Sequence, residues 1–368
     1  MSIVRARWLP GPLASLLAAC SGNSSPPPQV SAAASENVLN VYNWSDFIGP
    51  SIISDFEKES GIKVHYDVYE TNEMMEVKLL SGHTNYDIVV PGGSFFEREV
   101  KAGVYRKLDK SLLPNLKNLD PGAVLATAVY DPGNQYGVDY TWLISVGIGY
   151  ELAKVKARLP NAPLESWSLM FDPKLLARLR DCGVSVLDSP DDVVGSVLAY
   201  LGRDPNSESP EDLASAEEVL RAIRPYVRYV DSTRYVADLA NGDLCLALGW
   251  SGDIAQARRR AMEAGHAVTI GYSVPKEGAL SIVDVMAIPA DAPHPKNAHV
   301  FIDYLLRPEV AAKNAAAITY ASGVAGSESD TAVYPAPEAR ARLVPMRARS
   351  QEFTRALMRM WTRFKTGQ

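Results

Sequence analysis

Short apolar runs alternate with longer amphipathic segments from residue 38 onward. The runs at residues 38–42, 62–68 and 86–90 are rich in Val, Ile and Tyr, and they predict strands. Between them, residues 51–60 and 72–80 carry apolar residues at helical spacing, and Gly61 ends the first of these helices. Strands separated by helix-length segments are typical of an α/β domain with a largely parallel sheet.

A second region of similar rhythm begins at residues 136–142 and 147–150. Further strands are predicted at residues 184–187, 244–249 and 283–288. Helices are predicted at residues 172–180, 191–201, 214–223, 232–241, 253–264, 296–306, 308–317 and 347–365. In sheets of this kind a ligand sits beyond the carboxyl ends of the strands, so the residues that follow each strand are the first candidates for a site.

Two predicted strands end in a tryptophan, a serine and an aspartate. Trp44, Ser45 and Asp46 follow the first strand, and Trp250 with Asp253 follows the strand at residues 244–249. An indole face beside a carboxylate suits an organic cation, because the ring attracts the charge and the carboxylate accepts its N–H groups. The alternative is structural, with each tryptophan in the core and each aspartate capping a helix. The pair of loops, together with a third carboxylate at Asp284, favours a cation site.

Composition and charge narrow the function classes. With 368 residues the chain is long enough for two domains, and its net charge of -6 gives no basic surface for nucleic acid. Five scattered histidines and three cysteines show no metal-ligand spacing. We therefore expect no metal, no cofactor and no nucleic-acid partner.

The first 36 residues predict an export signal and a spacer. Residues 1–20 combine Arg5 and Arg7 with a short apolar segment and the small-residue run before Cys20. Cys20 directly after Leu-Ala-Ala resembles a bacterial lipobox, which predicts a lipid-modified cysteine; the alternative is an ordinary secretory signal with an incidental cysteine. Residues 21–36 are too poor in large apolar side chains to fold and predict a disordered spacer.

Five motifs in order resemble one family. They are NWSD at residues 43–46, YDIVVP at 86–91, CGVS at 182–185, YLGRDPNS at 200–207 and WSGD at 250–253. Together they resemble the periplasmic polyamine-binding proteins of ABC importers, the putrescine-binding type above all. The resemblance runs from about residue 38 to the C-terminus.

The resemblance implies an α/β fold of two lobes, the type II periplasmic solute-binding fold, with hinge crossovers and an interlobe cleft. We expect the N-terminal lobe to comprise residues 37–138 and 254–303, and the C-terminal lobe residues 139–253 and 304–368. The crossings would then lie near residues 138–139 and 250–253. By position, the family pocket corresponds to Trp44, Ser45, Asp46, Trp250, Asp253, Asp284 and Tyr320.

Four positions depart from the family pattern. Phe47 stands where a tyrosine is expected, Gly92 where a serine is usual, Asp192 where a glutamate is usual, and Ile282 in place of an aromatic residue. The changes enlarge the distal end of the pocket, so a longer or bulkier amine than putrescine is an open alternative. The resemblance also implies a disulfide between Cys182 and Cys245; the alternative is two free buried thiols.

The resulting expectation is a monomeric lipoprotein of the periplasm that binds a small cationic polyamine and delivers it to an ABC permease. Its only membrane contact would be the lipid anchor. Three alternatives stay open: a binding protein of this fold for another solute (a sugar, an opine or an amino acid), a sensor of polyamines, and an enzyme on the same fold.

Overall fold

One long strand, β4 (Gly137–Glu151), is shared by two sheets and connects two lobes. The computed structural model describes residues 37–327 and 335–367. The expected signal peptide, Cys20 and the spacer lie outside the described residues. In the part described, no helix has both the length and the apolar character that a membrane span requires.

The first lobe has a mixed sheet in the order β2-β1-β3-β9-β4. Its strands β1 (Val38–Trp44), β2 (Lys63–Tyr69) and β3 (Ile88–Val89) are parallel, and β9 (Ala279–Ala287) runs antiparallel to β3 and β4. β10 (Leu343–Pro345) pairs with the start of β9.

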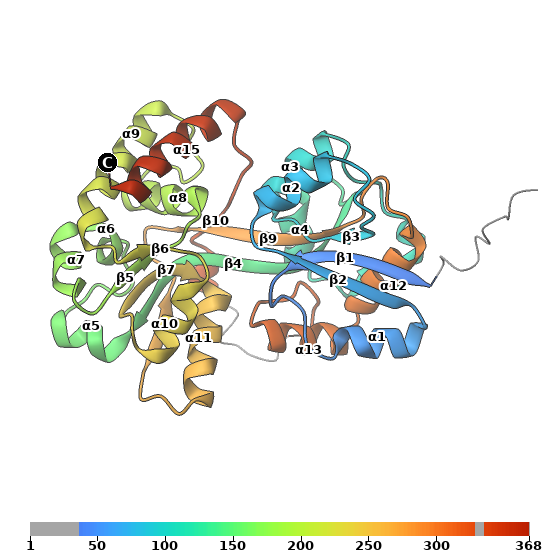
Figure 1. The fold of residues 1–368 in the computed structure, drawn as a ribbon, viewed down its shortest axis with the longest axis horizontal. Helices are drawn as coiled ribbons and strands as arrows, with labels where there is room; N and C mark the ends of the chain where they lie inside the picture. The colour runs from blue at the N-terminus through green and yellow to red at the C-terminus, as the bar shows by residue number, and fades with distance from the viewer. Residues whose placement is uncertain (1–36, 328–334, 368) are drawn as a thin grey trace, which may run out of the picture. The chain divides into compact units, whose positions relative to one another are not determined.

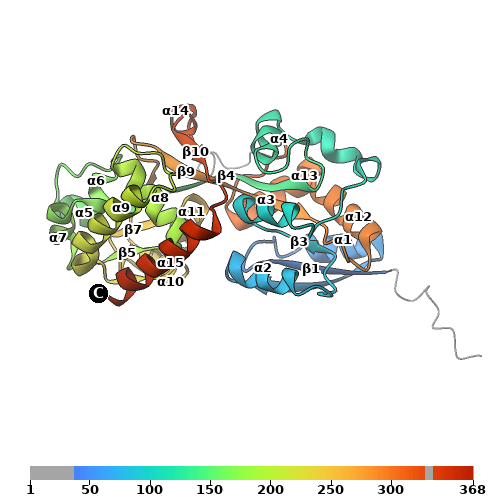
Figure 2. The ribbon, with the colours of Figure 1, turned by 90° about the horizontal axis from the view of Figure 1, so that it is seen from above.

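Helices cover both faces of this first sheet (Figures 1 and 2). One face packs against α1 (Ile52–Ser60), α12 (Pro295–Leu305) and α13 (Pro308–Ile318). The other packs against α2 (Asn72–Leu80), α3 (Gly93–Lys101) and α4 (Pro121–Ala128).

Strand β1 shows why the two faces differ. Its side chains alternate, so Leu39 and Val41 enter the core with Phe56 and Phe301, whereas Tyr42 enters the opposite core with Met75.

The second lobe has the strand order β8-β4-β7-β5-β6. Here β5 (Val184–Val186) runs parallel to β6 (Tyr229–Val230) and β7 (Leu246–Trp250), while β8 (Ile270–Ser273) and β7 flank β4 antiparallel. Its helices are α5 (Leu152–Arg158), α6 (Ser168–Phe171), α7 (Pro173–Leu179), α8 (Pro190–Tyr200), α9 (Pro210–Ile223), α10 (Arg234–Asn241), α11 (Ser251–Glu263) and α15 (Gln351–Thr366).

The expected lobe boundaries need correction. Helix α11 buries Ile254, Ala257 and Ala261 in the core of the second lobe, although residues 254–303 were assigned to the N-terminal lobe. Residues 304–324, expected in the C-terminal lobe, supply Tyr304, Val310 and other side chains to the core of the first. The chain stays in the second lobe after Trp250 because the apolar face of α11 is buried there.

The chain crosses between the lobes along two strands, β4 and β9. β4 pairs with β9 up to Ser145 and with β7 from Val146, so it passes between the lobes there, not at residues 138–139. β9 returns next to it, with Leu280 in the second core and Val283 in the first (Figure 1). The second crossing is therefore near Ile282 and not at residues 250–253.

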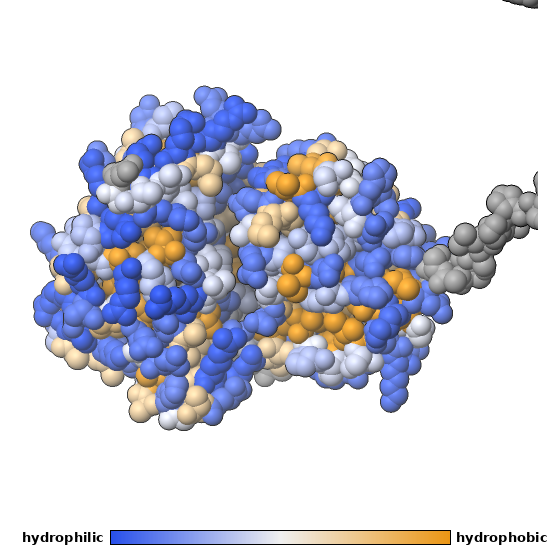
Figure 3. Space-filling view, viewed as in Figure 1, coloured by the Kyte–Doolittle hydropathy of each residue, from blue (hydrophilic) through white to orange (hydrophobic). Residues whose placement is uncertain are grey.

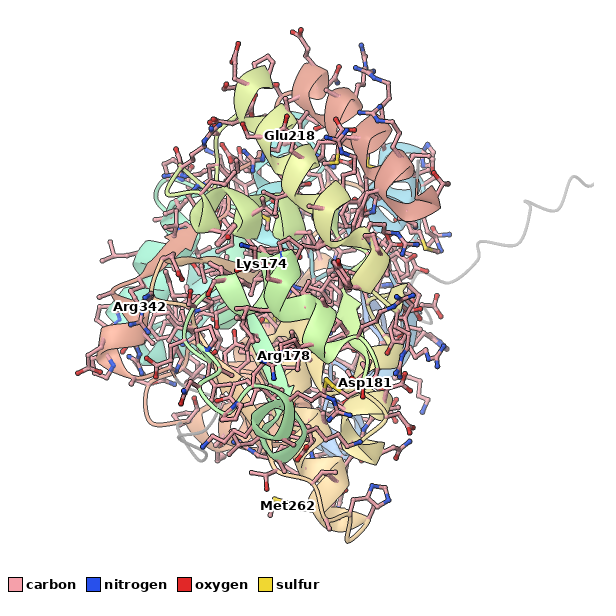
Figure 4. All side chains as sticks on the ribbon, turned by 90° about the vertical axis from the view of Figure 1, so that its left-hand side faces the viewer. Lys174, Arg178, Asp181, Glu218, Met262 and Arg342 are labelled. Carbon is pink, nitrogen blue, oxygen red and sulfur yellow. A yellow bond between two sulfur atoms is a disulfide. The ribbon has the colours of Figure 1, made fainter. Side chains whose placement is uncertain are left out.

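The disulfide between Cys182 and Cys245 is confirmed. The two Cα atoms are 5.5 Å apart and the residues are 63 positions apart in sequence. The bond joins the segments that lead into the paired strands β5 and β7, at the end of the second lobe where Asp181 is labelled in Figure 4. It fixes the two neighbouring strand starts and lies away from the cleft residues described next.

Candidate ligand-binding site

The two lobes meet around Trp250 and Ile282. Both side chains are partly buried, and each packs against the cores of both lobes. On the face seen in Figure 3 the surface is hollowed between the lobes. A cavity of about 420 Å³ opens there, lined by Thr71 and Glu73 of the first lobe and by residues of the second that include Asp188 and Trp361. The expected interlobe cleft is therefore present.

Asp284 comes from β9 just beyond the crossing. Its side chain is buried, and Oδ2 accepts a 2.8 Å hydrogen bond from the hydroxyl of Thr141 on the neighbouring strand. Its backbone pairs with Gly92, which places the turn after β3 beside it. Burial raises the pKa of Asp284 to about 7. The structure thus holds a carboxyl group that titrates near neutral pH at the junction of the lobes.

Asp253 lies in the first turn of α11, and two tyrosines hold it. Tyr320 of the first lobe and Tyr235 of the second donate to its two carboxylate oxygens at 2.6 and 2.7 Å. The Tyr235 hydroxyl in turn accepts the backbone N–H of Trp250 at 3.2 Å. Burial raises the pKa of Asp253, and the two tyrosine hydroxyls oppose that shift. The carboxylate is therefore oriented by groups from both lobes.

Asp192 lies in the first turn of α8. Its Oδ2 accepts the indole N–H of Trp250 at 3.1 Å, and its Oδ1 is buried without a hydrogen-bond partner. Burial raises the pKa of Asp192 to about 7, and the carboxylates of Asp191 and Glu73 add to the shift. Glu73 and Pro190, which lies two positions before Asp192, both line the interlobe cavity.

Aromatic rings bound the site on the side of the first lobe. The indole of Trp44 donates to the carbonyl of Val90 at 2.9 Å and packs on Tyr69 with ring centroids 4.5 Å apart. Phe47 packs edge-on against Tyr320 at 5.2 Å. Among the described residues the rings of Trp44 and Trp250 are not paired. Trp44 contacts residues of the first lobe, whereas Trp250 donates to Asp192 and packs against both cores.

The remaining expected residues follow strands β1 and β3. Ser45 donates to Glu70 at 3.0 Å, and Asp46, which is exposed, lies 3.9 Å from the guanidinium of Arg260 on α11. At Gly92 a Cβ atom would come within 3.1 Å of the Asn72 side chain, which accepts the Gly92 N–H at 3.0 Å. The approach is close, and the Asn72 amide would have to shift by a few tenths of an ångström to admit a Cβ.

Sequence reasoning missed Tyr235 and Thr141, whose hydroxyl groups donate to site carboxylates. Neither belongs to a motif: Tyr235 lies 18 positions before Asp253, and Thr141 lies 143 positions before Asp284. Arg259 of α11 likewise donates to the carbonyls of Ala316 and Ala317, far from it in sequence. Only the pairing of distant strands and helices brings these groups together.

The carboxylates of Asp192, Asp253 and Asp284 share one property. In the described part of the chain, none of them has a cationic side chain within ion-pair distance. Two lobes joined by crossing strands, with such a site at their junction, define the class of two-lobe periplasmic solute-binding proteins.

The comparisons with known proteins agree with this class. Residues 51–341 match the family model for bacterial extracellular solute-binding proteins. The chain is 43% identical, over 100% of both chains, to the putrescine-binding periplasmic protein PotF of Escherichia coli (strain K12). It is 45% identical to the putrescine-binding periplasmic protein SpuD of Pseudomonas aeruginosa (strain UCBPP-PA14), over 91% of this chain and 94% of that one.

Solved structures show the same likeness. A putative spermidine/putrescine ABC transporter from Listeria monocytogenes superposes with a TM-score of 0.79 at 30% identity, covering 90% of this chain and 100% of that chain. A lipoprotein of Treponema pallidum superposes with a TM-score of 0.76 at 26% identity, covering 89% and 99%.

The chain belongs to the family of bacterial extracellular solute-binding proteins. The resemblance to the putrescine-binding type and the two-lobe α/β fold are both confirmed. The family consists of binding proteins, which agrees with the expectation that this chain is not an enzyme.

Proposed function

We propose that this chain is the periplasmic solute-binding component of an ABC importer and that it captures an aliphatic polyamine between its lobes. Asp192, Asp253 and Asp284 would accept the ammonium groups. Trp44, Phe47 and Trp250 would pack against the methylene groups between them. Ser45 and Asp46 would contact the ligand at the rim, with Gly92, Ile282 and Tyr320 lining the pocket.

The observation that carries this proposal is the set of unpaired carboxylates at the lobe junction. An ionised carboxylate taken out of water without a partner costs several kcal/mol, so a cationic ligand is the natural partner. Asp192 and Asp284 are buried, and neither has an ion-pair partner among the described side chains. An amino acid would call for an arginine that clamps its carboxylate, and Arg260 is instead at the rim beside Asp46.

The ligand class follows from the spacing of charge and apolar surface. A diamine needs a carboxylate for each ammonium and an apolar path between them, and the two tryptophans with Ile282 would form that path. Asp192 has a shorter arm than the glutamate usual in the family, which leaves room at the distal end. We therefore propose putrescine or a longer polyamine of the same type.

The membrane anchor and the transport partner belong to the same proposal. Cys20 would carry the lipid, which the lipobox sequence and the likeness to a lipoprotein of known structure support. Delivery to a permease is supported by the relatives, one of which is named as part of an ABC transporter. Growth with labelled palmitate tests the anchor: the wild-type chain takes up the label and Cys20→Ser does not.

Isothermal titration calorimetry tests the binding. Because residues 37–368 form one compact unit, the protein without its first 36 residues can be unfolded and refolded to remove bound ligand. It is then titrated with putrescine, cadaverine, spermidine, spermine and agmatine, with arginine and a sugar as controls. Micromolar or tighter binding of an amine that is lost in Asp253→Asn is the expected result.

A matched variant makes the test specific. Asp181→Asn removes an exposed carboxylate paired with Arg158 on the second lobe, and it should bind the amine as the wild type does. Silence of the wild-type protein toward all five amines, with a correctly folded sample, would overturn the proposal. Equal loss in both variants would show that net charge, and not the site, governs binding.

A further inference from the structure

A second cavity, lined by apolar side chains and a few polar ones, lies in the first lobe, apart from the ligand cleft. It has a volume of about 190 Å³ and is bounded by α4, the start of β4 and the segment that contains Leu108 and Leu116. The side chains of Thr127, Asn134 and Asp139 line it. One water occupies about 30 Å³ in the liquid, so the cavity has room for an ion with part of its hydration shell.

The polar atoms that line this cavity have no partners in the described structure. Both carboxylate oxygens of Asp139, the hydroxyl of Thr127 and Oδ1 of Asn134 are buried without a hydrogen bond. Asp139 is 3% exposed and Thr127 is 1% exposed. Buried polar groups are nearly always satisfied, so four unsatisfied oxygens around one cavity point to an occupant.

The orientation of Asn134 strengthens this reading. Its Nδ2 donates to the carbonyl of Val124 at 3.0 Å, so Oδ1 is the free end of the amide. Asn134 has a positive φ of 47°, which asparagine tolerates better than most residues. The site therefore offers oxygen acceptors: Nδ2 of Asn134 donates to Val124, and the Thr127 hydroxyl can both donate and accept.

The cavity also lacks a cationic partner for Asp139. Lys110 lines it, but its ammonium group donates to the carbonyl of Gly133 at 3.0 Å. The Gly323 backbone lies against the carboxylate without reaching hydrogen-bond geometry, and a Cβ there would come within 2.2 Å of Oδ1. Burial and the carboxylate of Asp284 raise the pKa of Asp139, and its contact with the Gly323 backbone opposes that shift.

We propose that this cavity binds an alkali-metal cation, held by the carboxylate of Asp139, the hydroxyl of Thr127 and the amide oxygen of Asn134. Hard cations prefer carboxylate, carbonyl and water oxygens, and this is the donor set that lines the cavity. Asp139 is the one carboxylate among the lining residues, so it balances a single positive charge. With a divalent ion, the single carboxylate would leave one positive charge buried and unbalanced. In the described chain, moreover, no group of three or more His, Cys, Asp or Glu side chains could hold a metal ion.

Anomalous diffraction tests the site directly. Crystals of the protein grown in rubidium chloride should show an anomalous peak in the cavity, within coordination distance of Asp139, Thr127 and Asn134. Ordered waters alone, or the ammonium group of Lys110 turned toward Asp139, would overturn the proposal.

Thermal unfolding gives a second readout. Sodium, potassium and rubidium chloride should raise the midpoint in a saturable way, by a few degrees relative to choline chloride at equal ionic strength. Asp139→Asn should abolish the difference between the salts. Thr127→Val is a milder change, and it should shift the salt concentration that gives half of the stabilisation at least severalfold. Glu99→Gln is the matched control, because Glu99 is also buried with an unpartnered oxygen but does not line this cavity. An identical effect of choline chloride would refute the proposal.

Discussion

The two carboxyl groups with a pKa near 7 predict that amine binding depends steeply on pH. Burial raises the pKa of Asp192 and of Asp284 to about 7 in the ligand-free protein. An ammonium group beside either carboxylate stabilises its ionised form and lowers that pKa. Binding therefore releases protons below pH 7, and the affinity rises with pH until both groups are ionised.

The magnitude follows from the fraction of each group that is ionised. A carboxyl group with a pKa of about 7 is roughly one-eleventh ionised at pH 6 and ten-elevenths ionised at pH 8. Each carboxylate that must be ionised to bind thus changes the dissociation constant by about tenfold, or about 1.4 kcal/mol, between these pH values. If the amine contacts both Asp192 and Asp284, the change is about a hundredfold.

Calorimetry measures both quantities. Titrations at pH 6, 7 and 8 in buffers of different ionisation enthalpy give the affinity and the number of protons released. We expect close to two protons at pH 6 and almost none at pH 8. Asp284→Asn should retain about half of the pH dependence in its residual binding, and Asp181→Asn should retain all of it. An affinity that changes less than twofold between pH 6 and pH 8, without proton release, would refute the reasoning.

Three further predictions concern single contacts. Asp284→Asn should stabilise the ligand-free protein at pH 8 by up to about 4 kcal/mol in thermal or urea unfolding. The reason is that a carboxyl group with a raised pKa destabilises the fold above its unfolded pKa, and this cost is complete above pH 7. A lower unfolding midpoint would contradict this. Tyr235→Phe should weaken amine binding by about 5- to 30-fold in calorimetry, since it removes one of two donors to Asp253, and an unchanged affinity would show that Tyr320 suffices. Cys182→Ser with Cys245→Ser should cost about 4 kcal/mol in urea unfolding, and reducing agent should lower the wild type to the same value and leave the variant unchanged.

Local sequence patterns predicted elements well where the relevant interactions are short-range. The helix predicted at residues 72–80 is α2 with the same bounds, and Thr71 caps it as helix propensity would suggest. The predicted segments at residues 136–142 and 147–150 instead form one strand, β4. Gly92 and Gly93, which follow the strand predicted at residues 86–90, begin helix α3. Glycine at a strand end is compatible with a turn and with a helix start, so the sequence alone could not decide between them.

Lobe membership could not be predicted because it depends on pairing between distant segments. Trp250 packs against both cores, so the residues around it do not indicate whether the chain passes from one lobe to the other at this point. The answer comes from β8, which returns after α11 to pair with β4 in the second lobe. The same limit applies to the site: its carboxylates are visible in the sequence, whereas Thr141 and Tyr235 are found only through the fold.

The placement of the carboxylates links binding to the arrangement of the lobes. Asp192 and Asp253 begin helices of the second lobe, Asp284 lies on the strand that crosses into the first, and Trp44 belongs to the first lobe. Tyr320 of the first lobe donates to Asp253 of the second, so a polar contact joins the lobes at this point. A cation that contacts both sides adds interactions available only when the lobes are together. Because a ligand shifts an equilibrium only by its differential affinity, these unpaired carboxylates are what would make an amine favour the closed arrangement.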